Sequence, residues 1–276
     1  MIYGREKIGK TTWAASYPDA LFLSTEPGTK GLRIHEYNAE DGGCRNWGLV
    51  RSAVGLLEEQ PDRYKTVVID TADRAYELCL DHVCAELGID HPGVSPDGKE
   101  DFGKSWKAVR KEFTDVIHRI LQTGRGLVFT SHSKEENYKA RTGEPFTRIH
   151  PSMSGQARAV VEALVDMFFY ADYMRAPDGE TRRVLVTEGN DLVWAGHRAI
   201  EGADGESVRL PRLIPMMEKG GYALLQAAFA GRDVGLDPAS LLPSKTASKA
   251  VREFYQAVRT APRAARVPIR KVLVRR

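Results

Sequence analysis

The pattern of apolar and polar positions divides the chain into short apolar runs and longer amphipathic stretches. Three short runs, at 20–25, 66–71 and 126–132, are bounded by turn residues or charges. Such runs are typical of parallel strands that are covered on both faces. Residues 103–122 place apolar side chains at spacings of three and four, which predicts a helix with one apolar face. Residues 73–87 show a weaker form of the same pattern.

Strands that alternate with helices predict an α/β fold with a mostly parallel central sheet, flanked by helices and joined by right-handed crossovers. After residue 164 the pattern changes. The runs LVDMFFYADYM and RRVLVTEG, separated by RAPDGET, predict a β-hairpin with a Pro-Asp-Gly turn. We expect further helices near 219–230 and over 245–260, and a surface loop over 88–101.

Composition is that of an ordinary globular protein, with 42% hydrophobic and 28% charged residues. No apolar run approaches the roughly 18 residues of a membrane span. The first twenty residues carry Lys7 and Lys10 where a signal peptide would be apolar. Cys44, Cys79 and Cys84 show no disulfide or metal spacing, so we expect reduced thiols. These features favour a cytoplasmic protein, in a bacterial or phage-infected cell, with no membrane partner.

Charge is distributed unevenly along the chain. Residues 236–276 hold ten Lys and Arg against two Asp and Glu, a net of +8, which leaves −5 for the rest of a chain of net charge +3. We therefore predict one large domain over 1–235 and a basic C-terminal tail over 236–276, part helical and part disordered. The tail either meets a polyanion or is a solvated end.

The stretch GREKIGKT, residues 4–11, matches the phosphate-loop pattern G-x-x-x-x-G-K-[ST]. In such a loop the backbone N–H groups and the following helix N-terminus surround phosphate oxygens. The lysine reaches the β- and γ-phosphates and the threonine holds Mg²⁺. We predict ATP and Mg²⁺ as cofactors, with these residues in contact: Gly4, Arg5, Glu6, Lys7, Ile8, Gly9, Lys10, Thr11 and Thr12. For Lys7, a solvated surface charge is an equal alternative.

An apolar stub, Ile2 and Tyr3, precedes the loop. The strand before a phosphate loop is expected to begin several residues earlier than this. Either the true start lies upstream, or this edge of the loop is weakly supported.

A second acidic element follows one strand–helix unit later. The run TVVID ends in Asp70, which is the Walker B form, in which the carboxylate holds the Mg²⁺ shell. We assign Thr11 and Asp70 as the metal residues. Thr71 and Asp73 are expected to cap the next helix.

Two more polar residues follow predicted strands. Glu26 lies just past the strand that succeeds the phosphate loop, where a carboxylate can orient and polarise the water that attacks the γ-phosphate. The alternative for Glu26 is a loop residue beside Lys30. His132 ends the run GLVFTSH, where it can hydrogen-bond the γ-phosphate and pass its presence to the next loop. The alternative for His132 is a structural or solvated side chain.

The sequence resembles the RecA-like ATPases, and within them the phage-type nucleotide-binding proteins of the Sak branch, which act as single-strand annealing or recombination ATPases. The resemblance spans roughly residues 1–217. It rests on these stretches: IYGREKIGKTTWAASYPDALFLSTEPGTKGL, YKTVVIDTADRAYELC, FGKSWKAVRKEF, GLVFTSHSKEE, RRVLVTEGNDLVWAGHR and LPRLIP. The phosphate loop with T-E-x-G-T carries the RecA-like class, and the other matches carry the phage branch.

The resemblance implies a RecA-like P-loop core over 1–235, with Lys10, Glu26 and His132 as the catalytic residues. It implies ATP at the interface of a homo-oligomer, reached by a basic residue of the neighbouring protomer. Arg198 matches that region, with Arg182 and Arg183 as alternatives.

The segment after His132 carries features of a single-stranded DNA contact. Basic residues alternate with aromatic ones, as at sites that follow phosphates and stack unpaired bases; they are Lys134, Tyr138, Lys139, Arg141, Phe146 and Arg148. Glu135, Glu136 and Glu144 lie in the same segment and weaken the indication of DNA binding. In RecA-like folds the loop after this strand faces DNA. The segment 88–107, which ends in Lys104 and Lys107, is a second candidate.

These observations predict an ATP-hydrolysing, oligomeric protein of phage-type DNA recombination or single-strand annealing. Two alternatives use the same phosphate loop: a small-molecule or nucleotide kinase, and an assembly module that binds ATP without hydrolysis.

Overall fold

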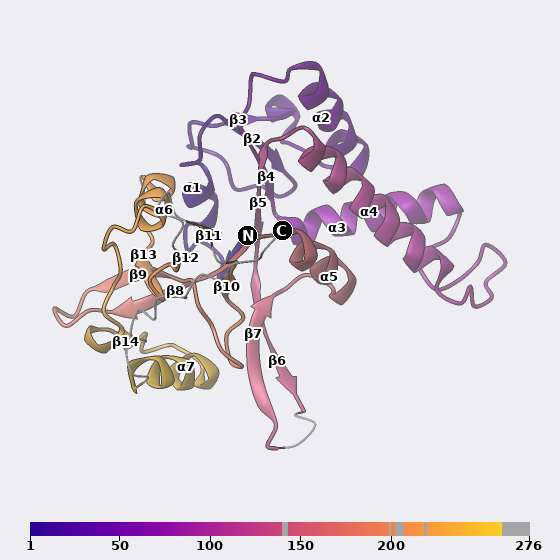
Figure 1. The fold of residues 1–276 in the computed structure, drawn as a ribbon. Helices are drawn as coiled ribbons and strands as arrows, with labels where there is room; N and C mark the ends of the chain where they lie inside the picture. The colour runs from indigo at the N-terminus through magenta and orange to yellow at the C-terminus, as the bar shows by residue number, and fades with distance from the viewer. Residues whose placement is uncertain (140–142, 199, 202–206, 218–219, 261–276) are drawn as a thin grey trace, which may run out of the picture. The chain divides into compact units, whose positions relative to one another are not determined.

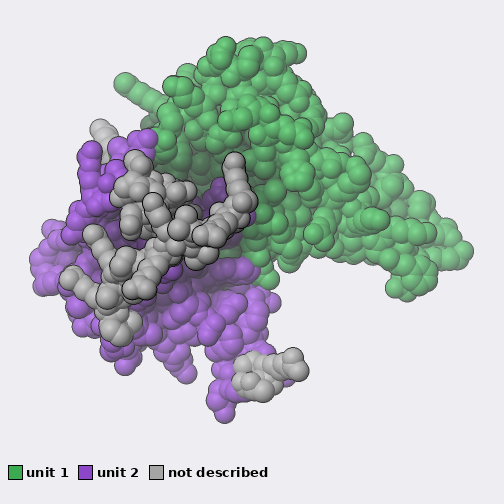
Figure 2. All heavy atoms as spheres, viewed as in Figure 1, with its two compact units in different colours: residues 1–134, 151–165, 218–222 green, residues 135–150, 166–217, 223–276 purple. Residues whose placement is uncertain are grey.

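The computed structural model describes residues 1–139, 143–198, 200–201, 207–217 and 220–260 (Figure 1). The chain forms two compact units (Figure 2). Unit 1 contains residues 1–134, 151–165 and 218–222, and unit 2 contains residues 135–150, 166–217 and 223–276. Arg141 and the tail segment 261–276 lie outside the described residues. The predicted division at residue 235 stays a prediction.

The parallel sheet of unit 1 confirms the predicted fold class. Its strands are β1 (Ile2–Gly4), β2 (Ala20–Ser24), β3 (His35–Glu36), β4 (Thr66–Asp70) and β5 (Gly126–Ser131), in the spatial order β1-β5-β4-β2-β3. Every neighbouring pair in this order is parallel. The strand β5 therefore lies between the strand of the phosphate loop and the strand that ends in Asp70. The short β1 pairs with β5 through Ile2 and Tyr3, so the apolar stub is a strand.

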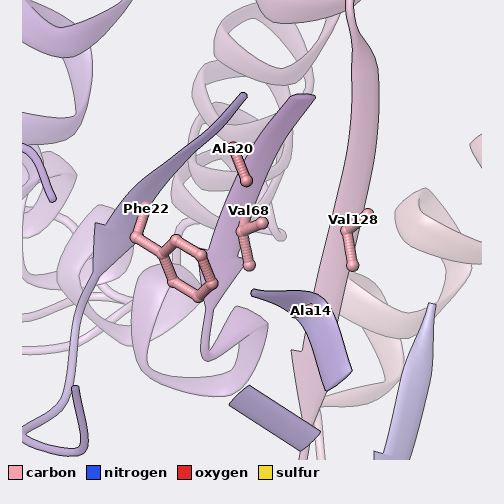
Figure 3. Close-up of a cluster of buried hydrophobic side chains, with 5 residues drawn as sticks. All are labelled: Ala14, Ala20, Phe22, Val68 and Val128. Carbon is pink, nitrogen blue, oxygen red and sulfur yellow. The ribbon is translucent and has the colours of Figure 1, made fainter. Parts of the chain in front are cut away.

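One face of this sheet is covered by α1 (Lys10–Ala14). Figure 3 shows Ala14 beside Phe22, Val68 and Val128, one side chain from each of three neighbouring strands, together with Ala20. These side chains are buried, and burial of apolar area contributes about 25 cal/mol per Å².

The opposite face of the sheet is covered by longer helices. Side chains alternate between the two faces of a strand, so the intervening positions face away from α1; they are Leu21, Leu23, Val67, Ile69 and Phe129, all buried. On this side, α3 (Ala72–Leu87) contacts β4 and β5, and α4 (Lys104–Gln122) contacts β5 (Figure 1). The apolar face predicted for 103–122 is buried from Val109 to Ile120.

Two helices of unit 1 were not expected from the sequence. One is α2 (Trp47–Glu59), which begins where the Asn46 side chain accepts a hydrogen bond from the amide of Leu49. The other is α5 (Gly155–Leu164), capped by Ser154. A capping side chain satisfies one of the unpaired amides of the first helical turn.

Unit 2 contains an antiparallel sheet. Its strands β8 (Met167–Arg175), β9 (Thr181–Val186) and β13 (Leu213–Pro215) pair in the order β13-β9-β8, and β10 (Gly196–His197) and β14 (Leu242–Pro243) each pair with β8. The β8–β9 pair confirms the predicted hairpin. Its turn closes through the amide of Ala176 and the carbonyl of Glu180, with Gly179 at φ 85°. A positive φ is easily adopted by glycine alone.

The segment after His132, which the resemblance to RecA-like folds presents as a loop, is a β-hairpin. It consists of β6 (Ser133–Tyr138) and β7 (Phe146–Pro151), which form a two-stranded sheet. The predicted surface loop over 88–101 is irregular, with a β-bridge between Val94 and Glu100. The second candidate segment, 88–107, includes this loop and the start of α4.

The remaining elements are short or terminal: η1 (Ala39–Asp41), β11 (Ile200–Glu201), β12 (Ser207–Val208), α6 (Gly221–Phe229), η2 (Pro238–Ser240) and α7 (Lys249–Thr260). Helices α6 and α7 confirm those expected near 219–230 and within 245–260. In the part of the chain that the structure describes, none of the helices has the length and apolar character needed to cross a bilayer.

Candidate active site

The carboxyl ends of β1, β2, β4 and β5 meet at one edge of the parallel sheet of unit 1. Ligands of open α/β sheets bind at such an edge. A cavity of about 580 Å³ lies there, within the usual size range of small-molecule sites. Its lining includes the residues that the sequence singled out together with neighbours from two loops: Glu6, Lys7, Gly9, Lys10, Thr11, Thr12, Glu26, Pro27, Gly28, Lys30, Leu32, Asp70, Thr71 and His132.

The phosphate loop begins at the end of β1 and leads into α1. Gly9 has φ 105°, a left-handed conformation that suits glycine, and it immediately precedes the first helical residue. Lys7 also has positive φ, at 58°, and its side chain is exposed at the cavity. Because α1 has only five residues, the loop amides contribute more to an anion site here than a helix dipole does.

Other loop residues have distinct surroundings. Arg5 and Glu6 are exposed, whereas Ile8 is fully buried and anchors the loop in the core. The side chain of Thr12, like that of Glu6, lines the cavity.

The ammonium of Lys10 is held inside the loop. Its Nζ donates to the carbonyl oxygens of Gly4, at 2.9 Å, and Arg5, at 2.8 Å. Burial lowers the pKa of Lys10, although the nearby carboxylates of Asp70, Asp73, Glu26 and Glu6 oppose this effect. A bound polyphosphate would add negative charge beside the ammonium and favour its protonated form.

Thr11 and Asp70 both line the cavity and are hydrogen-bonded to each other. Thr11 Oγ1 donates to Asp70 Oδ2 at 2.8 Å, and the buried Thr130 hydroxyl donates to Asp70 Oδ1. A hydroxyl and a carboxylate are hard oxygen ligands of the kind that Mg²⁺ takes together with water and substrate phosphates. Among the described residues, no cluster of three or more His, Cys, Asp or Glu side chains is suited to a metal ion. The oxygens of Thr11 and Asp70 therefore fit a Mg²⁺ ion whose remaining ligands are phosphate oxygens and water.

Glu26 and His132 form a pair at the tips of β2 and β5. His132 Nε2 lies 3.2 Å from Glu26 Oε2, and Thr71 Oγ1 donates to Glu26 Oε1 at 2.9 Å. The hydrogen bond from His132 is the main cause that lowers the pKa of Glu26, and the same bond raises the pKa of His132. The lone pairs left on each carboxylate oxygen can accept a hydrogen bond from water.

The loop that carries Glu26 is fixed to β4 by its backbone. The amide of Thr25 donates to the carbonyl of Asp70 at 2.8 Å, and Thr25 Oγ1 exchanges hydrogen bonds of 2.9 Å with the amide and carbonyl of Thr71. The carboxylate of Glu26 contacts Thr71 and His132, and Lys30 lines the same cavity. Whether Glu26 is the base or a loop residue beside Lys30 stays a prediction.

Over residues 1–199 the sequence matches the family described as AAA domain. The chain belongs to the AAA domain family. A P-loop AAA-type ATP-binding domain is therefore present.

Comparison with solved structures finds a likeness to a KaiC-like protein, PH0186, from the hyperthermophilic archaeon Pyrococcus horikoshii OT3. The TM-score is 0.41 at 12% sequence identity, covering 78% of this chain and 88% of that chain. A search of curated proteins found no match.

The AAA domain brings most of the predicted residues to one cavity: Gly9, Lys10, Thr11, Thr12, Glu26, Asp70 and His132, with Glu6 and Lys7 at its rim. Gly4 and Arg5 contribute carbonyl oxygens to Lys10. Arg198 belongs to unit 2, where its guanidinium lies 3.0 Å from the carboxylate of Asp166. The role assigned to each of these residues stays a prediction.

One prediction at this site was wrong. Thr71, and not Asp73, caps α3, because its side chain accepts from the amide of Arg74. The carboxylate of Asp73 instead accepts from Ser131 Oγ, at 3.0 Å, from the amide of His132, at 3.3 Å, and from Ser152 Oγ.

Sequence reasoning missed two hydroxyl groups of the AAA domain. Thr130 contacts Asp70, and Thr25 contacts Thr71. An isolated threonine in or after a strand gives no sequence signal of its own. The order β1-β5-β4 would have revealed Thr130, since it places the end of β5 beside Asp70.

Proposed function

We propose that this AAA domain protein is a Mg²⁺-dependent ATPase of phage-type DNA recombination or single-strand annealing, and that it acts on single-stranded DNA as a homo-oligomer with ATP between protomers. One observation carries the hydrolytic part of the proposal. A carboxylate, Glu26, lines the same cavity as the phosphate-loop Lys10 and the Thr11–Asp70 pair.

The residues of the site fit ATP and Mg²⁺. Lys10 and the loop amides would hold the phosphates, and Thr11 and Asp70 would hold the ion. The Nδ1 atom of His132 is buried and has no hydrogen-bond partner among the described residues. A ligand or a water molecule would supply the missing hydrogen bond. Bound ATP supplies the phosphoanhydride bond that is cleaved.

The chain's own residues would divide the remaining work. Glu26 accepts the proton of the attacking water, and Thr71 holds one of its carboxylate oxygens in place. His132 donates from Nε2 to the other oxygen and balances the charge of the carboxylate. Lys10 stabilises negative charge that develops on the phosphate.

The β6–β7 hairpin supports the DNA part of the proposal. The rings of Tyr138 and Phe146 stack with centroids 5.9 Å apart, and the Arg148 guanidinium lies 5.1 Å and 5.4 Å from the two centroids. Lys134 and Lys139 are exposed on the same hairpin. Aromatic faces with nearby cations suit unpaired bases and their phosphates.

The test is ATP hydrolysis measured with and without single-stranded DNA, with the molecular mass determined in parallel. Wild type should hydrolyse ATP faster when DNA is present. Lys10→Ala should lose ATP binding, and the same change at Lys65, an exposed lysine of unit 1 paired with Asp19, should not. Glu26→Gln should keep ATP binding and lower kcat by roughly 10²- to 10⁴-fold.

Each other outcome contradicts part of the proposal. Hydrolysis by Glu26→Gln at the wild-type rate would remove the base assignment. Phosphate transfer to an added acceptor would favour a kinase, and ATP binding without ADP release would favour an assembly module. If single-stranded DNA changes neither the rate of ATP hydrolysis nor the molecular mass, the proposed role in DNA binding is wrong.

A further inference from the structure

The carboxylate of Asp73 lies beside the nucleotide site without lining its cavity. It stands in the first turn of α3, three positions after Asp70, and does not cap the helix. Among the described residues, its three hydrogen-bond donors come from other parts of the chain. Two of them, Ser131 and His132, lie at the end of β5, and the third, Ser152, follows β7.

These donors stand on both sides of the β6–β7 hairpin. The chain leaves unit 1 after Lys134 and returns to it at Pro151, so residues 131–132 lie just before the exit and Ser152 just after the return. The amide of Ser152 also donates to the carbonyl of His132 at 2.9 Å. One carboxylate thus holds the outgoing and the returning strand of the hairpin at the same point.

His132 is the residue that these contacts share with the active site. Its backbone amide is bound by Asp73 and its backbone carbonyl by Ser152, while its imidazole is bound by Glu26. The amide of His132 lies 3.3 Å from Asp73, so this bond is a long one, and the 2.9 Å bond from the amide of Ser152 to the His132 carbonyl restrains the same residue from its other side. We call residues 131–134 and 151–153 the stem of the hairpin. A movement of the stem that breaks these bonds would displace the imidazole of His132 from Glu26.

We propose that Asp73 is a positioning residue that fixes His132 against Glu26 and makes the orientation of Glu26 respond to the hairpin 133–151. The inference rests on the proposed function, because it takes Glu26 as the base and single-stranded DNA as the ligand of the hairpin. A ligand on the hairpin changes the stem, the stem acts on Asp73 and Ser152, and His132 transmits the change to the carboxylate. DNA stimulation of hydrolysis then has a defined structural route.

Two variants and two matched controls test this route. Asp73→Asn removes the charge and one acceptor site, and Ser152→Ala removes only the bond to the returning strand. Asp81→Asn makes the first change at an exposed position of α3, and Ser133→Ala makes the second within the hairpin stem. For each, kcat and KM for ATP are measured with and without single-stranded DNA, and backbone hydrogen exchange is measured without either ligand.

Asp73→Asn should lower kcat about tenfold and leave KM for ATP within about twofold, because a positioning residue acts on the chemical step. Ser152→Ala should keep the basal rate within about twofold and reduce DNA stimulation about fivefold, which is within the range of known coupling residues. Both variants should speed amide exchange at 131–134 and 151–153. Neither control should do so.

The proposal is overturned if Ser152→Ala lowers the basal and stimulated rates equally, because the contact would then be merely structural. Unchanged exchange at the stem in both variants would also overturn it. If wild type neither hydrolyses ATP nor responds to DNA, the proposed function fails. Hydrogen exchange, which needs neither ligand, then still decides whether Asp73 and Ser152 fix the stem.

Discussion

Glu26 and His132 are separated by 106 positions in the sequence, yet Nε2 of the imidazole lies 3.2 Å from the carboxylate. The two residues follow β2 and β5, which have β4 between them in the sheet. Glu26 is therefore held from two sides, by Thr71 at the end of β4 and by His132 at the end of β5. The candidate base is a fixed group rather than a side chain on a free loop.

The first prediction concerns the pH dependence of this pair. The pKa of Glu26 is lowered from 4.5, so its contribution to stability is present above pH 4.5 and is lost as the pH falls through the folded-state value. The pKa of His132 is raised from 6.5, so its contribution is full below pH 6.5 and is lost as the pH rises through the folded-state value. The pair should stabilise the fold most between pH 4.5 and 6.5.

Urea unfolding of wild type and His132→Gln over pH 3–9 measures this difference. Because both side chains are about one third exposed, solvent screens the pair, and the maximum should be about 1 kcal/mol. A difference that does not vary with pH would show that the two groups are not paired as charges.

The second prediction concerns the hydroxyl that sequence reasoning missed. Thr130→Val keeps the shape of the side chain and removes the donor to Asp70 Oδ1. The Asp70 carboxylate loses one of its two restraints, so the Mg²⁺ concentration for half-maximal activity should rise several-fold. Stability should fall by about 1–3 kcal/mol, since a buried acceptor loses its partner.

Thr66→Val is the matched control, because Thr66 is a buried threonine at the opposite end of β4 from Asp70. It should leave the Mg²⁺ requirement unchanged. An equal Mg²⁺ requirement in Thr130→Val and wild type would show that the Thr130 hydroxyl does not orient Asp70.

The third prediction concerns the hairpin aromatics. Tyr138→Leu keeps an apolar side chain and removes the ring that stacks on Phe146. If the ring stacks on a base, single-stranded DNA binding should weaken by about 1–3 kcal/mol, measured by fluorescence anisotropy, with little change in the salt dependence. Tyr37→Leu makes the same change at a half-buried tyrosine of unit 1 that lies outside both candidate DNA-contact segments, and it should leave DNA affinity unchanged. Equal affinity of Tyr138→Leu and wild type would exclude the stacking.

The fourth prediction concerns the start of α6. A Cβ added at Gly221 would lie 2.6 Å from the ring of Trp13, which is almost completely buried. Gly221→Ala should therefore destabilise the protein by about 1–3 kcal/mol, because the ring has no free space to move into. At Gly155, the first residue of α5, a Cβ meets nothing within 4 Å. Thermal unfolding should show no loss for Gly155→Ala, and similar melting temperatures for both variants would contradict the packing argument.

The sequence predicted the elements whose signals are local. The apolar runs that became β2, β4 and β5 and the apolar face of α4 were found because burial on both faces, or on one, leaves a regular pattern. Lys10 and Thr11 were singled out because the phosphate-loop pattern fixes their spacing, and Asp70 because it ends an apolar strand run. The hairpin β6–β7 was missed because its exposed strand Ser133–Tyr138 carries charges in place of alternating apolar residues.

Asp73 shows why the rest of the site was not predictable. The helix dipole stabilises an acidic residue in the first turn of a helix, so the sequence position of Asp73 indicates a cap. Its actual partners, Ser131 and Ser152, are 58 and 79 positions away, and only the sheet order and the path of the hairpin bring them to it. The role expected of Arg198 in a neighbouring protomer stays a prediction, because one chain does not contain the partner that it would contact.

Thr71 has one hydroxyl for two tasks: it begins α3 by accepting from the amide of Arg74, and it donates to Glu26. The start of α3 and the position of the candidate base therefore depend on the same oxygen atom. Among the twenty side chains, only serine could replace it without changing one of the two properties. A change at Glu26 therefore tests the proposed base alone, whereas a change at position 71 would disturb the helix start and the candidate base together.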